Sequence, residues 1–380
     1  MATTVSAPAL QQRNIALDVF RGMTICFMII VNTPGNGETS FSPLKHAAWN
    51  GFTPTDLVFP SFLFAVGNSL SFVMNKWMTS SSQSVVWKIL KRTFIIFLLG
   101  YLMYWFPFIR LDKDHHIILA PIANTRIMGV LQRIALCYGI ASLMLYFLKV
   151  RTTVIICILL LFGYWILLYA FGDPADPLSM QGNAGFKLDK WLMGENHMYH
   201  GEGVAFDPEG WLSTLPAIGN VVGGFLVGKW IQKKGDYEGI LKLLLWGFGL
   251  MVCGYFWDLL LPINKKLWTS SFVVYTIGID CVIIGLLFYF IQLKGNTKGT
   301  YFFQVFGKNP LFIYLLSELL DTVLYMIPVG NSNGLNHWLY QNVFSLAGAY
   351  LGSLLFAVAY MLVCWCVGYW LDKRKIYVRV

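Results

Sequence analysis

The chain has 380 residues, of which 57% are hydrophobic and 12% are charged, and its formal net charge is +9. A soluble domain carries about a quarter charged residues, so this composition excludes a fully water-soluble surface. The basic residues are scattered over short loops rather than gathered on one face, which argues against nucleic-acid binding.

Ten apolar segments follow one another along the chain. A helix that crosses the ~30 Å apolar core of a bilayer needs about 20 residues, and most of the segments approach that length. The expected spans are Ile15–Val31, Leu57–Met74, Thr93–Phe108, Ile127–Leu148, Val154–Phe171, Trp211–Trp230, Ile240–Leu261, Ser270–Gln292, Pro310–Ile327 and Val343–Trp370. They predict an all-α polytopic membrane protein, a bundle of about ten transmembrane helices forming one domain over residues 1–380.

The positive-inside rule orients this bundle. With a cytoplasmic N-terminus, about nineteen Lys and Arg residues fall on the cytoplasmic side and about eight on the outer side. Both termini are therefore expected in the cytoplasm. The first apolar segment contains Asp18 and Arg21 and no small-residue cleavage site follows it, so no cleavable signal peptide is expected.

The longer connections are expected on the outer side, at residues 33–55, 110–126, 172–210 and 328–342. All six histidines lie in them: His46, His115, His116, His197, His200 and His337. Loops carry function more often than the helices that hold them, so chemistry or binding is expected outside. His197 and His200 lack an evident third ligand, and the seven cysteines fall within predicted spans, so no metal site or disulfide framework is expected.

The most informative segment runs from Lys45 to Pro60, where the first outer loop meets the second span. Histidine can take and return a proton near neutral pH, which suits His46 for general-base catalysis. Asp56 can orient its imidazole, and Asn32 at the outer end of the first span can donate to an oxyanion. Alternatively, Asp56 is the N3 acid of a helix capped by Thr53, and His46 and Trp49 are interfacial anchors.

Several other polar residues have two readings each. Arg133 lies inside a span, and it either contacts substrate or pairs with Asp280, Glu318 or Asp321. Lys308 and Asn309 precede Pro310 at a cytoplasmic helix start, where they either bind a phosphate or simply begin the helix. The same two possibilities apply to Arg21, Lys91 and Arg92. Asp207 and Glu209 either favour a helix N-terminus by their charge or bind the hydroxyls of a sugar, with Trp191 and Trp211 stacking on its ring.

The sequence resembles the heparan-α-glucosaminide N-acetyltransferase family of transmembrane acyltransferases over nearly its whole length. The resemblance is carried by Asp18-Val19-Phe20-Arg21-Gly22, Val31-Asn32, residues 46–60, Gly129-Val130-Leu131-Gln132-Arg133, residues 194–199, residues 206–210 and residues 264–270. His-Ala-x-Trp-Asn-Gly and Asp-Leu-Val-Phe-Pro are specific when they occur together. The family's lysosomal enzyme has an additional N-terminal luminal domain and one more helix, which this sequence is expected to lack, as a bacterial-type homologue would.

The resemblance implies transfer of acetyl from cytosolic acetyl-CoA to an amine on the far side of the membrane, such as a terminal glucosamine, or to a hydroxyl. It implies His46, Asp56 and Asn32 as catalytic residues and a homodimer in a bacterial inner membrane. The expected substrate contacts are Asn50, Trp49, Arg133, Asp207, Glu209 and Trp268, and the expected acetyl-CoA contacts are Arg21, Lys308 and Asn309. The alternative function is a secondary transporter of a small polar solute, with Arg133 and Asp280 on its pathway.

Overall fold

The computed structural model describes residues 14–111, 116–329 and 334–378, and within them eight helices are long and apolar enough to cross a membrane. These are α1 (Ile15–Asn32), α2 (Pro54–Trp77), α4 (Val130–Phe147), α5 (Val150–Phe171), α7 (Thr214–Lys234), α8 (Tyr237–Asp258), α9 (Ser270–Phe288, continued by a π turn to Leu293) and α13 (Ala349–Lys373). The prediction of an all-α polytopic membrane protein is confirmed.

The two remaining expected spans correspond to α3 (Ser82–Trp105) and α11 (Pro310–Met326), which fall outside the eight. Helix α3 begins eleven residues before the expected start at Thr93, because Lys88, Lys91 and Arg92 lie within the helix rather than in a loop. Long basic side chains extend along apolar surface while their charged ends reach water, so charge alone does not end a helix. Helix α11 has only 17 residues.

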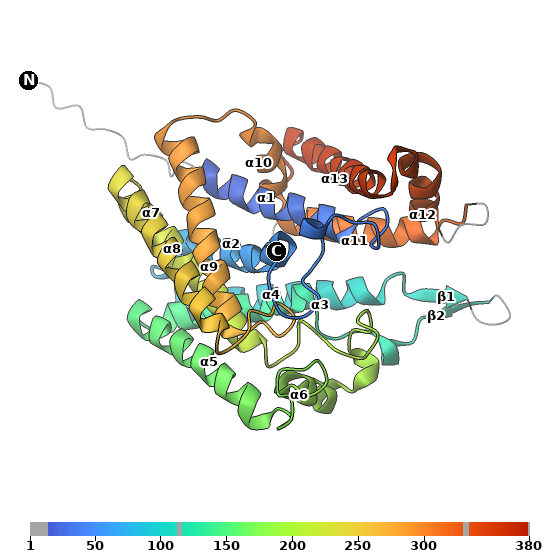
Figure 1. Cartoon of the computed structure of the whole chain (residues 1–380). Coiled ribbons are helices and arrows are strands. Elements are labelled where there is room, and N and C mark those ends of the chain that lie inside the picture. Colours follow the sequence, from blue (N-terminus) through green and yellow to red (C-terminus); the bar gives the residue numbers. More distant parts are fainter. Residues whose placement is uncertain (1–13, 112–115, 330–333, 379–380) are drawn as a thin grey trace, which may run out of the picture.

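Short elements fill the loops. They are the hairpin β1 (Ile109–Leu111) and β2 (Ile117–Leu119), with α6 (Ala184–Met193), α10 (Thr300–Lys308) and α12 (Leu335–Leu339). The two strands are antiparallel, with Ile109 opposite Leu119. Figure 1 shows the hairpin and α12 at one end of the bundle and the start of α1 at the other. The expected last span began too early, since a π turn over residues 340–344 continues α12 and α13 starts at Ala349.

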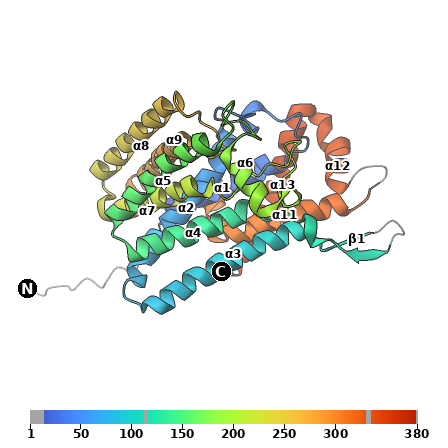
Figure 2. The same cartoon turned by 90° about the horizontal axis from the view of Figure 1, so that it is seen from below.

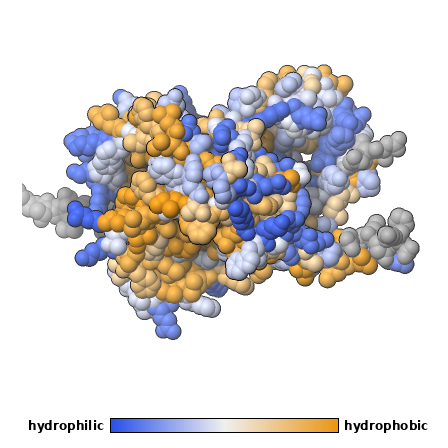
Figure 3. Space-filling view, turned by 60° about the horizontal axis from the view of Figure 1, so that its bottom comes forward, coloured by the Kyte–Doolittle hydropathy of each residue, from blue (hydrophilic) through white to orange (hydrophobic). Residues whose placement is uncertain are grey.

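The helices form a bundle whose outer surface is largely apolar. Figure 2 shows α5, α7, α8 and α9 on one side of the bundle and α11, α12 and α13 on the other. Large apolar side chains are exposed along α5 and α8, among them Leu159, Ile166 and Leu245. Figure 3 shows apolar residues over much of one face. Such a surface is expected where lipid tails take the place of water.

Helix α10 packs closely against α1. A Cβ added at Gly22 would lie 1.8 Å from the Phe303 carbonyl oxygen, and one added at Gly307 would lie 2.1 Å from the Asp18 carbonyl oxygen. The chain breaks at Asn309, where α10 ends and α11 begins. Because Arg21 donates to the Gly307 carbonyl oxygen at 3.0 Å, this break lies beside the second turn of α1, within the bundle.

Candidate functional site

His46 and Asp56 form a close pair at the start of α2. The His46 Nδ1 lies 2.7 Å from Asp56 Oδ1. The Asp56 side chain is 1% exposed, whereas the His46 side chain is 42% exposed. The carboxylate therefore holds one ring nitrogen from below, and the imidazole presents its other edge to open space. This is the arrangement that lets a carboxylate orient a histidine base.

The second oxygen of Asp56 fixes the loop that carries His46. It accepts from the backbone N–H of Ala47 at 3.2 Å, from the backbone N–H of Thr53 at 2.9 Å and from the Thr53 hydroxyl at 3.0 Å. The contact with the Thr53 N–H is one half of a capping box. Both readings of Asp56 are thus compatible in one geometry, since one carboxylate starts α2 and holds His46.

Two further expected site residues, Trp49 and Asn50, are anchored to other loops. The Trp49 indole donates to the Leu178 carbonyl oxygen at 3.0 Å and its ring contacts Phe206 edge-on. The Asn50 amide oxygen accepts from Asn264 at 3.1 Å. Lys266 donates to the Ala48 carbonyl oxygen at 3.0 Å, so residues 46–50 are held by segments more than a hundred positions away in the sequence.

Asn32 is the last residue of α1, the helix that packs against α2. Arg21, three turns earlier on α1, donates to Ser69 on α2 at 3.0 Å. The Asn32 side chain is exposed, and its amide donates to Glu318 Oε1 at 3.3 Å.

Arg126 forms a buried ionic cluster that the sequence did not single out. Its guanidinium donates to both oxygens of Asp207, at 3.0 and 2.7 Å, and to Glu209 at 2.6 Å. It also lies over the rings of Tyr104 and Tyr199. Burial alone would raise the pKa of Glu209, but Lys265, Arg126 and Arg133 more than offset it and hold that pKa below its usual value. Both carboxylates proposed for sugar binding are therefore engaged by Arg126.

Arg133 is fully buried, and among the described residues it forms no ion pair with Asp280, Glu318 or Asp321, so the ion-pair alternative finds no support. Its guanidinium donates to the Gly210 carbonyl oxygen at 3.1 Å and to the Ser213 hydroxyl, and it lies 4.9 Å from the ring centroid of Trp268. Trp268 is fully buried as well. The three acids have other partners, namely Ser61 for Asp280, Asn32 for Glu318 and Asn336 for Asp321.

Asp189 on α6 supports the same loop and gives a testable pH dependence. Its carboxylate accepts from the Trp211 backbone N–H at 2.9 Å. Burial raises the pKa of Asp189 from 3.8 to about 7. The folded protein therefore binds this proton more tightly than the unfolded chain, and stability is lost as the pH rises from about 4 through 7. We expect Asp189→Asn to reduce that loss, by up to about 2.5 kcal/mol, in thermal unfolding measured from pH 5 to pH 8.

The control for this prediction is Asp176→Asn, because Asp176 is exposed in the same outer loop. It should retain the parent's pH profile. An Asp189→Asn protein whose profile matched the parent's would exclude Asp189 as the titrating group.

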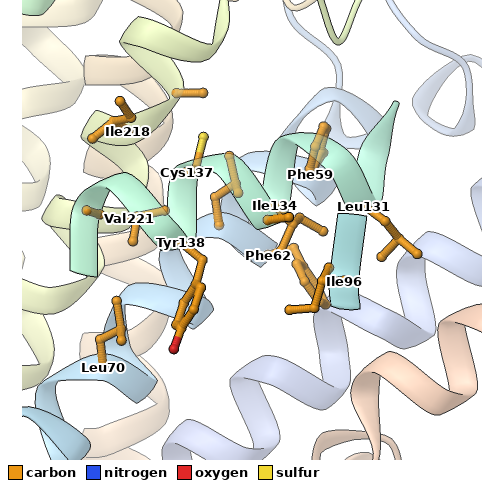
Figure 4. Close-up of a cluster of buried hydrophobic side chains, with 14 of the residues drawn as sticks. Phe59, Phe62, Leu70, Ile96, Leu131, Ile134, Cys137, Tyr138, Ile218 and Val221 are labelled. Atoms are coloured by element: carbon orange, nitrogen blue, oxygen red, sulfur yellow. The ribbon is translucent and has the colours of Figure 1, made fainter. Parts of the chain in front are cut away.

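A cavity of about 340 Å³ opens among α1, α2, α3, α4 and the α10–α11 break. On α2 its lining extends from Phe62 to Trp77, which is about 22 Å of helix at 1.5 Å per residue. Its deeper wall is apolar, and Figure 4 shows Phe62, Ile96 and Ile134 together on one side of α4. The cavity is therefore a long apolar channel that covers much of the bundle's depth.

One mouth of this cavity is basic. Arg21, Arg92 and Lys308 all line it. Lys308 is paired with both carboxylate oxygens of Asp372 at 2.8 Å, and Arg92 lies over the ring of Tyr138. Asn309, the other expected donor contact, instead binds the backbone of Ile376 and Val378, at 3.0 and 2.9 Å, and so fixes the segment after α13.

The structure thus joins some predicted residues and separates others. His46, Asp56, Asn32, Trp49 and Asn50 lie at the outer ends of α1 and α2, whereas Arg21 and Lys308 share the inner cavity. The residue that sequence reasoning missed is Arg126. The sequence did carry a signal for Arg126. It lies in an outer loop with few basic residues, where an arginine is expected to have a specific partner.

The chain is similar in sequence to a known protein family. Residues 13–244 match the family described as heparan-alpha-glucosaminide N-acetyltransferase, catalytic. The chain is similar to the heparan-alpha-glucosaminide N-acetyltransferase of Mus musculus, at 28% identity over 80% of this chain and 53% of that protein. It is similar to the Homo sapiens protein of the same name at 27% identity, over 82% and 54% respectively. The chain therefore spans about half the length of these relatives.

Proposed function

The chain belongs to the heparan-α-glucosaminide N-acetyltransferase catalytic family, and from that membership we propose that it moves acetyl from acetyl-CoA across the membrane to an amine such as that of a terminal amino sugar. The observation that carries this proposal is that α2 links two features. Its residues from Phe62 to Trp77 line a cavity with a basic mouth, and Asp56 in its first turn holds His46.

The donor would enter from the cytoplasmic side. Arg21 and Arg92 would bind its phosphates, and Lys308 would join them if it exchanged its Asp372 partner for a phosphate. The slim arm of the donor would then extend along the apolar wall toward Phe62 and Ile96. Phe62 lies six residues from Asp56 on α2, or about 9 Å, so the thioester would have a short remaining distance to the histidine.

At the outer end, His46 would serve as general base. Asp56 would hold its Nδ1, so that the free Nε2 removes a proton from the acceptor as the acceptor attacks the thioester carbon. Asn32 would donate to the oxyanion that forms there. The proton held by His46 would pass to the departing thiolate. An acetyl-histidine intermediate is the alternative chemical route from the same geometry.

The orientation supports an acceptor on the extracytoplasmic side of a bacterial inner membrane. The loops that hold His46 belong to the basic-poor side, and Lys308 and Arg92 belong to the basic-rich side. Trp49 and Asn50 would shape the acceptor site, while Arg133, Trp268, Asp207 and Glu209 would support it from behind. A homodimer, expected from the family resemblance, stays a prediction.

The donor site can be tested by removing one mouth cation. We expect Arg92→Gln to weaken acetyl-CoA binding about tenfold to hundredfold, because a hydrogen bond to a charged group contributes roughly 1.5–3 kcal/mol. Isothermal titration with acetyl-CoA on the purified protein measures this. Saturating acetyl-CoA should also raise the parent's unfolding temperature, since it binds the folded state.

Lys88→Gln is the matched control, since Lys88 lies one turn earlier on α3, is exposed and does not line the cavity. It should leave acetyl-CoA affinity unchanged. If the parent bound no acetyl-CoA, the acetyltransferase proposal would give way to the solute transporter. If Arg92→Gln and Lys88→Gln weakened acetyl-CoA binding equally, the phosphates would not bind at this mouth.

A further inference from the structure

Glu318 is a carboxylate inside the bundle that the reaction outlined above leaves without a role. It lies eight residues into α11, and the described partner of its side chain is the Asn32 amide at 3.3 Å. That hydrogen bond is long for a charged acceptor, which normally binds at about 2.7–2.9 Å. Ionisable residues within a membrane bundle are costly and commonly mark a functional site.

Helical periodicity places Glu318 on the outward continuation of the donor channel. Leu311 lines the channel, and Glu318 follows it by about two turns on the same face of α11. Arg21 lines the channel too, and Asn32 follows it by about three turns on the same face of α1. The Asn32–Glu318 contact therefore lies between the channel and the outer site.

The surroundings of Glu318 are polar and aromatic. Asn32 is exposed and Glu318 is partly exposed, so open space reaches this contact. On α11, Tyr314 lies one turn before Glu318 and Asp321 one turn after it, on the same face of the helix. An aromatic ring near a carboxylate suits a cationic amine.

The chemistry of amine acetylation calls for a second proton acceptor. An amino sugar arrives largely as an ammonium ion, which must lose one proton before its nitrogen can attack and a second as the amide forms. His46 takes one of these and returns it to the thiolate. On the acetyl-histidine route, His46 is acylated when the amine arrives and cannot deprotonate it beforehand.

We infer that Glu318 binds the acceptor's ammonium group beside Asn32 and takes its first proton, an assignment that rests on the proposed acetyl transfer. The carboxylate becomes a carboxylic acid, and the neutral amine attacks the thioester carbon as the C–S bond breaks. His46 takes the second proton and delivers it to the thiolate, giving the free thiol. Glu318 then releases its proton to the outer solvent, so one proton is released for each amide formed.

The test compares two acceptors in Glu318→Gln, whose side-chain oxygen can still accept from Asn32. Glucosamine is mostly an ammonium ion at pH 7, whereas hydroxylamine is mostly neutral. We expect the variant to transfer acetyl to glucosamine up to about tenfold more slowly than the parent, because roughly a tenth of an amine with a pKa near 8 is neutral at pH 7. Transfer to hydroxylamine should stay near the parent rate. Glucosamine transfer should recover as the pH is raised and the free amine becomes abundant.

The ratio of the two rates, taken on one sample, does not depend on how much of the variant is folded. Asp321→Asn is the control, because Asp321 lies one turn further along α11 and is bonded to Asn336, and its ratio should match the parent's. An unchanged ratio in Glu318→Gln would overturn this role for Glu318. A parent that transferred acetyl to neither acceptor would instead count against the proposed function.

Discussion

His46→Ala is expected to lower acetyl transfer by about 10²–10⁴-fold, the usual contribution of a positioned general base. Acetyl-CoA affinity should change little, because His46 lies at the outer end and the basic mouth of the channel lies at the inner end. The substitution therefore affects the transfer step without affecting acetyl-CoA binding. Initial rates with labelled acetyl-CoA, together with titration of the same preparation, measure both quantities.

Two variants make this result specific. His197→Ala removes another outer-loop histidine, whose Nδ1 lies 2.7 Å from the Thr125 carbonyl oxygen, and it should stay active. Asp56→Asn keeps the size of the side chain but removes the charge that orients His46, so it should lose activity while α2 remains capped. A His46→Ala protein that bound acetyl-CoA and transferred acetyl near the parent rate would remove His46 from the mechanism.

Arg126→Leu is expected to destabilise the protein by about 3–5 kcal/mol, because it leaves two buried carboxylates without their shared cation. Asp207 is 3% exposed and Glu209 is 5% exposed, so water cannot readily replace the guanidinium. The change should lower the unfolding temperature and loosen the loop after residue 200. Thermal unfolding in detergent and limited proteolysis of the outer loops measure these effects.

The control for Arg126→Leu is a substitution in an exposed ion pair of the long loop between α5 and α7. Lys190 and Glu195 lie 2.7 Å apart, but their side chains are 55% and 50% exposed. Exposed pairs contribute about 0–1 kcal/mol, so Lys190→Gln should leave the unfolding temperature nearly unchanged. Equal effects of the two substitutions would show that burial does not govern the Arg126 cluster.

Much of the fold could be predicted because bilayer spans depend on local composition. Apolar run length located α1, α2 and α5 to within a few residues, and Asn309 and Pro310 marked the start of α11 correctly. The start of α3 was missed because its first turns carry Lys88, Lys91 and Arg92, which a run-length criterion treats as a loop. Helix α6 was missed because it is short and lies outside the apolar core.

Only some contacts of the candidate site could be predicted from the sequence. The His46–Asp56 contact spans ten residues and could be foreseen from a loop that enters a capped helix. The partners of Arg126 and Asn32 come from other helices and loops, at separations of 81 and 286 residues. Such pairings depend on how the helices cross, and a single sequence carries no signal for that. The same reason explains why the sequence could not decide between the two possible roles of Arg133.

The anchoring of Ile376 and Val378 by Asn309 bears on how the protein can be handled in the laboratory. Val378 lines the basic mouth of the channel, so whatever follows it in a fusion protein starts at the donor's entrance. An affinity tag or fluorescent reporter added there would crowd the opening and carry its own charges to Arg21 and Arg92. A purification handle placed ahead of α1 avoids crowding at Val378, and it is the better choice for any assay of acetyl-CoA binding.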